Sequence, residues 1–252
     1  MSARRRVLVE ACVDAIDAAM EAEWGGADRI ELCGELLQGG VTPSHGLIEA
    51  VWDQVSIPLF VLIRPRAGDF LYTSDELDVM ERDIRVARAL HVDGIVAGAL
   101  TTEGDIDVAA MRCILDAARP MAVTFHRAFD FARDQDAALD ALLELEVDRV
   151  LTSGGAPTAL QGVENLARLN LRAGSELTVM AGGSITSANV GEVVRRSGVR
   201  EVHLRGAERV QSAMRHRRRD SLLARRPPLG DDERIVTRQT LVREVMEALS
   251  EL

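Results

Sequence analysis

The chain has 252 residues, of which 47% are hydrophobic, and its formal net charge of −10 argues against a nucleic-acid partner, for which a basic footprint is expected. It contains no lysine, which excludes three classes that need one at the chemistry: Schiff-base aldolases, pyridoxal-phosphate enzymes and Walker P-loop nucleotide hydrolases. No apolar run approaches the ~20 residues that span a bilayer, and Glu10 interrupts the stretch that a secretory signal would need. We therefore expect a cytoplasmic protein with no membrane partner and reduced cysteines.

Short apolar runs rich in β-branched residues alternate with longer amphipathic runs along the chain. The short runs predict strands at 7–13, 28–33, 58–64, 94–100, 121–126, 149–153, 177–181 and 201–204. The longer runs predict helices at 14–24, 44–55, 74–90, 107–118, 133–146, 158–170, 187–197 and 238–249. Strict alternation predicts a parallel sheet, and eight strand–helix units are the number that closes a TIM-type (β/α)8 barrel. No linker divides the chain, so we expect one domain over 1–252.

The segment 205–237 departs from this rhythm, because it separates the last strand from the last helix. Pro227, Pro228 and the following "GDD" are typical of loop, so we expect an extended loop here. Its "RHRRR" run at 215–219 is either a solvated basic loop or an anion-binding patch, and the acidic whole favours the solvated loop. A homodimer is the assembly that exposed barrel helices commonly support.

The first two strands each carry a glutamate followed two residues later by a cysteine. Side chains alternate faces along a strand, so Glu10 and Cys12 should point one way, as should Glu31 and Cys33. Carboxylates on adjacent strands lie ~5 Å apart, which should raise the pKa of one of them. Such a pair suits either an acid–base site or a metal site. A buried ion pair of Glu10 with Arg64 that only stabilises the barrel is a further alternative.

Polar residues also end most of the later strands, whereas the opposite strand ends are largely apolar in the sequence. Active sites of such barrels lie where the strands end, and burying charge there costs several kcal/mol unless it is paired. We therefore predict an acid–base group and an anion-binding group of side chains. The acid–base group is Glu10, Glu31, Arg64, His126 and Asp130. The anion-binding group is Arg66, Arg127, Ser153, Gly154, Gly182, Gly183, His203 and Arg205.

Two of these predictions have plain structural alternatives. Glycines after the sixth, seventh and eighth strands predict backbone N–H groups that hold a phosphate or another anion, but glycine also relieves crowding in tight turns. His126 is either a general acid or base, a ligand, or an imidazole whose hydrogen bonds are satisfied in the core. The sequence leaves both questions open.

Seven motifs resemble those of the CutC family of copper homeostasis proteins, in order from about residue 7 to 215: "GADRIELC", "GGVTPSHG", "IRPRAGDF", "VTFHRAFD", "RVLTSGG", "LQG" and "VMAGGSI". The resemblance implies a TIM-type barrel and cytoplasmic copper handling. It also implies Cu(I) binding at Cys12 and Cys33, and soft thiolates are ligands that Cu(I) prefers. One departure is visible: the family usually has small polar residues after the histidine of the eighth strand, where this chain has Leu204 and Arg205. We therefore expect its ligand preference to differ from that of its relatives.

Three functional hypotheses remain. The resemblance favours a copper-binding protein. The residues themselves favour an enzyme that acts by acid–base chemistry on a small anionic or phosphorylated substrate, because the positive charges of Arg64, Arg66 and Arg127 would oppose a cation. A small-molecule binding module without chemistry is the third.

Overall fold

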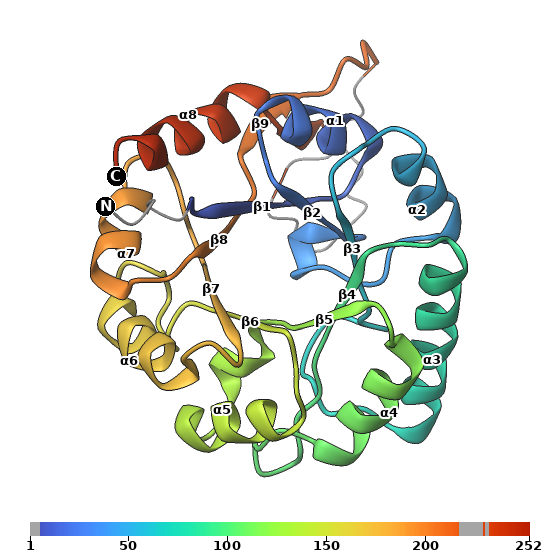
Figure 1. Ribbon diagram of the computed structural model, residues 1–252. Coiled ribbons are helices and arrows are strands. Elements are labelled where there is room, and N and C mark those ends of the chain that lie inside the picture. Colours follow the sequence, from blue (N-terminus) through green and yellow to red (C-terminus); the bar gives the residue numbers. More distant parts are fainter. Residues whose placement is uncertain (1–5, 217–228, 230–231) are drawn as a thin grey trace.

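The computed structural model describes residues 6–216, 229 and 232–252. Among them, eight parallel strands pair in sequence order, and the last pairs back with the first, so the sheet closes into a barrel (Figure 1). The barrel strands are β1 (Leu8–Val13), β2 (Arg29–Leu32), β3 (Leu59–Leu62), β4 (Gly94–Ala97), β5 (Ala122–Phe125), β6 (Arg149–Thr152), β7 (Thr178–Gly182) and β8 (Glu201–Leu204). The predicted TIM-type barrel is confirmed.

The helices form an outer ring around the barrel (Figure 1). They are α1 (Ile16–Trp24), α2 (His45–Trp52), α3 (Ser74–Ala89), α4 (Val108–Ala118), α5 (Gln135–Glu144), α6 (Val163–Ala173), α7 (Val190–Ser197) and α8 (Gln239–Ser250). Local sequence determines where α3 begins, because Thr73 and Glu76 form a capping box that satisfies free N–H groups of the first turn. In the described part of the chain, no helix combines the length and apolar character needed to cross a membrane.

The main hydrophobic core lies between the barrel and the helices. Alternate strand residues such as Val9, Ala11 and Val13 are fully buried and belong to this core. Their neighbours on the same strands, such as Glu10 and Cys12, face the barrel interior. The period of two therefore sends apolar side chains outward to the helices and leaves the interior free for polar ones.

Charged side chains fill the end of the barrel interior where the strands begin. Arg29 Nε lies 2.5 Å from Glu10 Oε2, and Arg29 Nη2 lies 2.6 Å from Glu201 Oε2. Arg149 Nε lies 2.5 Å from the same Glu201 oxygen. The expectation of largely apolar strand ends at this side is wrong, because Arg29, Arg149 and Glu201 are the first residues of their strands. An ion-pair network of Glu10, Arg29, Arg149 and Glu201 therefore closes this end of the barrel, and we call it the lower network.

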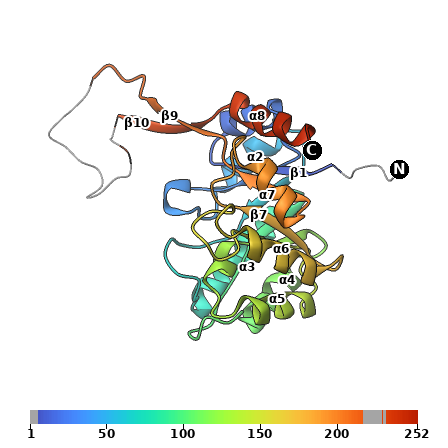
Figure 2. The same cartoon turned by 90° about the vertical axis from the view of Figure 1, so that its left-hand side faces the viewer.

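The segment after β8 contains two strands that the sequence analysis did not predict. β9 (Ala207–Gln211) and β10 (Glu233–Thr237) pair antiparallel, with Ala207 opposite Thr237, and Figure 2 shows them extending away from the barrel. The expectation of an extended loop over 205–237 is therefore wrong for both strands. Most of the basic run at 215–219 lies outside the described residues, as do Pro227 and Pro228.

Candidate functional site

Glu10 lies at the centre of the barrel interior, where it joins the lower network to the predicted site. The parallel register places it opposite Arg29 on β2 and His203 on β8. His203 Nδ1 lies 2.8 Å from Glu10 Oε1 and 3.5 Å from Glu31 Oε2. The alternative of a Glu10–Arg64 ion pair is wrong, because Arg29 occupies the matching register position and takes the carboxylate.

The two inward glutamates have very different environments, as the sequence predicted for carboxylates on adjacent strands. Burial acts to raise the pKa of Glu10, but the charge of Arg29 and the contacts with His203 outweigh it and lower this pKa to about 2. Burial raises the pKa of Glu31 to about 7, and the negative charge of Glu10 adds to the rise. At neutral pH Glu10 is therefore ionised, whereas Glu31 is close to its midpoint.

A cavity of about 210 Å³ has Glu31, but not Glu10, in its lining. Both Glu-x-Cys strands face it, since its lining includes Cys12, Glu31 and Cys33 together with His203. Burial and the charge of Glu31 raise the pKa of the Cys33 thiol well above its ordinary value. Burial acts to lower the pKa of His203, but its contacts with Cys12 and Glu10 outweigh this and raise it well above its ordinary value. Two thiols, a carboxyl and an imidazole thus share one buried space.

The far wall of this cavity is built by Arg64, Phe70 and His126. The Phe70 ring centroid lies 4.9 Å from the Arg64 Cζ and 4.9 Å from the centroid of the His126 ring. Phe70 is not among the predicted site residues, although it lies in the "RAGDF" motif that carries the family resemblance. We call Arg64, Phe70 and His126 the arginine wall.

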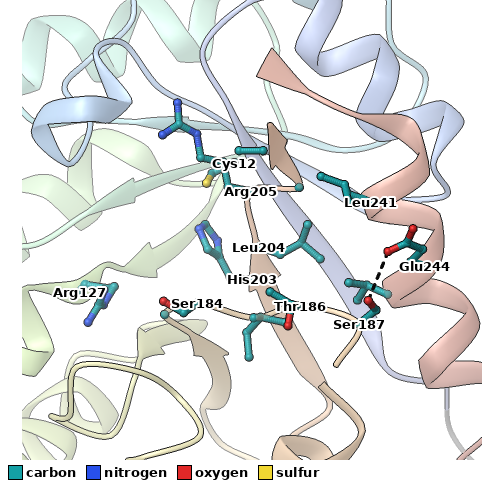
Figure 3. Close-up of a pocket in the computed structure, with 15 residues that line it drawn as sticks. Cys12, Arg127, Ser184, Thr186, Ser187, His203, Leu204, Arg205, Leu241 and Glu244 are labelled. Atoms are coloured by element: carbon teal, nitrogen blue, oxygen red, sulfur yellow. Dashed lines mark hydrogen bonds between the residues drawn. The ribbon is translucent and has the colours of Figure 1, made fainter. Parts of the chain in front are cut away.

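A second cavity of about 420 Å³ opens beside the first, between the ends of β7 and β8 and helix α8. It shares Cys12, Arg127, His203 and Arg205 with the first cavity. Figure 3 shows these four side chains on the barrel side of the second cavity and Glu244 of α8 on the other side. The two cavities are therefore neighbouring parts of one opening at the C-terminal ends of the strands, which we call the mouth.

Six of the predicted site residues do not line either cavity. They are Glu10, Arg66, Asp130, Ser153, Gly154 and Gly182. Arg66 is turned outward to Glu76 and Asp69, with Nε 2.5 Å from Glu76 Oε1, because the strand has ended and Arg66 lies in the following turn.

Asp130 stabilises the loop after β6. Its carboxylate accepts hydrogen bonds from the Thr152 hydroxyl at 2.5 Å and the Ser153 N–H at 3.1 Å, and it pairs with Arg127 at 2.7 Å. Gly154 has φ +73°, and a Cβ there would meet the Gly162 carbonyl oxygen, so this glycine permits a tight turn. Gly183, by contrast, lines the second cavity.

The donor atoms in the mouth can be grouped by the metal they suit. One oxygen of Glu10, one of Glu31 and a ring nitrogen of His203 lie within 4.8 Å of one another. Hard oxygen donors favour hard cations, but Arg29 already neutralises Glu10. Cys12, Cys33 and His203 line the same cavity, and thiolate and imidazole are donors that suit a soft ion such as Cu(I).

Comparison with known proteins supports the resemblance noted in the sequence. A human protein named copper homeostasis protein cutC homolog is 47% identical over 210 residues, which are 83% of this chain and 77% of the human protein. A CutC family protein of Mesorhizobium japonicum is 44% identical over 213 residues, covering 84% of this chain and 83% of the relative. The crystal structure of the putative copper homeostasis protein CutC from Streptococcus agalactiae superimposes with a TM-score of 0.75 and 32% identity, covering 79% of this chain and 98% of that one.

More distant barrels show the fold alone. A thiamine phosphate pyrophosphorylase from Pyrococcus furiosus superimposes with a TM-score of 0.60 at 15% identity, over 98% of each chain. The model of the CutC family matches residues 7–208, which include all eight barrel strands and the first two residues of β9. The chain therefore belongs to the CutC family.

Proposed function

We propose that this protein binds Cu(I) as its cargo, with the thiolates of Cys12 and Cys33 as ligands and His203 as a third donor. The observation that supports this most is that both cysteines line one cavity of about 210 Å³, Cys12 from β1 and Cys33 from the position directly after β2. Cu(I) is a soft ion that prefers thiolate and imidazole and needs few ligands. Relatives named for copper homeostasis agree with this choice of metal.

Proton release couples copper binding to pH. Burial and the Glu31 charge raise the pKa of Cys33, so this thiol is protonated at neutral pH in the free protein. A thiol loses its proton when it ligates a metal, so the apparent affinity for Cu(I) rises with pH. The same chemistry requires reduced thiols, and we therefore propose a cytoplasmic location.

A competition titration against a calibrated Cu(I) chelator tests the proposal on reduced protein under anaerobic conditions. We expect one Cu(I) per chain, and Cys12→Ser combined with Cys33→Ser should weaken binding by at least ~100-fold, because soft thiolates are replaced by hydroxyls. Cys113→Ser is the matched control, since Cys113 is exposed on α4, outside both cavities. Circular dichroism checks that all variants remain folded.

Tight binding that survives in the double variant would contradict the thiolate site. Glu31→Gln would then show whether the carboxylates hold the ion, because Glu31 belongs to the oxygen–imidazole cluster and is not a sulfur ligand. Equal losses in the double variant and in Cys113→Ser would indicate that copper binds exposed thiols nonspecifically.

A second candidate is acid–base catalysis on a small anionic substrate. It is favoured by the separation of the two carboxyl pKa values, about 2 for Glu10 and about 7 for Glu31, since such pairs commonly divide the roles of charged group and proton carrier. A screen of small anionic metabolites should then find a compound that the wild type converts and Glu31→Gln does not. Turnover that persists in Glu31→Gln would contradict this role.

A further inference from the structure

Arg64 is a buried cation that has no carboxylate counter-ion among the described residues. The residue is 6% exposed. Its Nη1 donates to the carbonyl oxygen of Gly40 at 2.8 Å and of Gly39 at 3.2 Å, and its Nη2 donates to that of Gly68 at 2.7 Å. These partners are neutral, and among the described residues no carboxylate forms an ion pair with this guanidinium. Burying an unpaired charge is costly, so the site is built to receive an anion.

Beside Arg64, the imidazole of His126 offers an unused hydrogen-bond donor. Its Nδ1 accepts the Ala128 N–H at 3.3 Å, while its Nε2 is buried without a partner within the described structure. Burial and the charge of Arg64 lower the pKa of His126 to about 3, so the ring is neutral at physiological pH. A neutral ring whose Nδ1 accepts carries its hydrogen on Nε2. His126 therefore presents an N–H to a ligand oxygen.

The other arginines of the cavity already have carboxylate partners. Arg127 Nε lies 2.7 Å from Asp130 Oδ2, and Arg205 Nη2 lies 3.4 Å from Asp14 Oδ2. Arg64 is thus the arginine of this cavity that has no carboxylate partner among the described residues. One guanidinium matches the single charge of a monoanion better than the two charges of a dianionic phosphate.

We propose that the arginine wall binds the carboxylate of a small monocarboxylic acid, with Arg64 supplying the charge and His126 Nε2–H donating to one carboxylate oxygen. The volume of about 210 Å³ limits the ligand, because pockets for drug-sized molecules occupy roughly 300–1,000 Å³. The site is preorganised, since the carbonyls of three glycines hold the guanidinium in place before any ligand arrives.

Gly98 is part of this preorganisation. A Cβ at this position would lie 2.7 Å from His126 Nδ1 and 2.8 Å from His126 Cε1, so only glycine leaves room for the imidazole. The site thus depends on residues that follow β3, β4 and β5 and on the loop that carries Phe70. Carboxylate binding at the arginine wall narrows the substrate class of the acid–base candidate function. It requires neither copper nor turnover.

Calorimetric titration of metal-free protein with acetate, lactate and pyruvate, at constant ionic strength, tests the proposal. Inorganic phosphate is the comparator. We expect saturable binding of at least one monocarboxylate, with phosphate at least ~10-fold weaker. Arg64→Met should weaken carboxylate binding at least ~30-fold, because a charge-assisted hydrogen bond is lost from a dry site. Arg85→Met removes the same charge from an exposed ion pair with Glu81 on α3 and should leave the affinity unchanged.

His126→Asn provides a second variant that does not depend on the fold of Arg64→Met. Asparagine retains an acceptor for the Ala128 N–H, as a good N-cap residue does, but it does not reach to the position of Nε2. We expect about 5–10-fold weaker carboxylate binding in this variant. Cys12→Ser with Cys33→Ser should retain carboxylate binding, which separates this proposal from the copper site.

Three results would overturn the proposal: no saturable binding of any of the three acids, tighter binding of phosphate than of the acids, or equal affinities in the wild type and His126→Asn. If Arg64→Met folds, an unchanged affinity in that variant would overturn it as well. The copper proposal and the acid–base proposal are unaffected by these outcomes, since they are measured as Cu(I) affinity and as turnover.

Discussion

Replacing Arg29 by methionine is expected to lower the free energy of unfolding by about 3–5 kcal/mol, the cost of leaving a buried charge without its partner. Arg29 is 7% exposed and contacts both Glu10 and Glu201. Without it, Glu10 keeps His203 as its remaining neighbour of opposite charge, while Glu201 keeps Arg149. The negative charges of the buried Glu10 and Glu201 would then be only partly balanced. The lower network would also lose the residue that joins β1, β2 and β8.

Urea denaturation at pH 7 measures this loss, with Arg172→Met as the matched control. Arg172 pairs with Asp140 at 2.6 Å, but both side chains are about half exposed, so water and salt screen the pair. We expect the control to have nearly wild-type stability. If Arg29→Met and Arg172→Met both lower the free energy of unfolding by equally little, the lower network does not stabilise the barrel.

The second large effect concerns His126 and the stability of the protein in mild acid. The pKa of His126 is lowered to about 3 in the folded state, whereas an imidazole of an unfolded chain titrates near 6.5. Between these values the unfolded state binds the additional proton. The contribution of the neutral ring is therefore fully present above pH 6.5 and is lost as the pH falls toward 3. From pH 7 to pH 5 the loss is about 2 kcal/mol.

The difference in unfolding free energy between the wild type and His126→Asn isolates this contribution, because all other titrating groups are common to both proteins. We expect the wild type to lose about 2 kcal/mol more than the variant between pH 7 and pH 5. Parallel pH profiles of the two proteins would show that His126 is protonated in the folded state, and the hydrogen-bond pattern inferred for its ring would then be wrong.

The barrel could be predicted from the sequence because hydrophobic periodicity determines which segments bury a face. Strand β8 (Glu201–Leu204) coincides with the predicted strand at 201–204, and the Glu-x-Cys alternation correctly predicts that Cys12 and Cys33 face one cavity. The raised pKa of Glu31 was also expected from adjacency, although burial raises it more than Glu10 does and the low pKa of Glu10 depends on Arg29 and His203. These features depend on local pattern and on the rule that neighbouring units pair.

The partners of the charged residues could not be predicted, because they depend on register between strands. A shift of one residue in the pairing of β1 with β2 would remove Arg29 from Glu10, and nothing local to either strand specifies that shift. The alternation that identified Glu31 and Cys33 also places Arg29 on the inner face, so the lower network had a readable signal. The β9–β10 ribbon was missed because the turn residues at 227–232 outweighed the short β-branched runs beside them.

The contact between Glu10 and His203 joins residues 193 positions apart in the chain. During synthesis the polypeptide grows by roughly 5–20 residues per second, so Glu10 emerges many seconds before the strand that carries His203. Until then the thiols of Cys12 and Cys33 lack the imidazole of His203, and the first strand lacks β8 as its second neighbour. A nascent chain on the ribosome therefore lacks one donor of the proposed copper site, and that site would be complete only when the barrel closes.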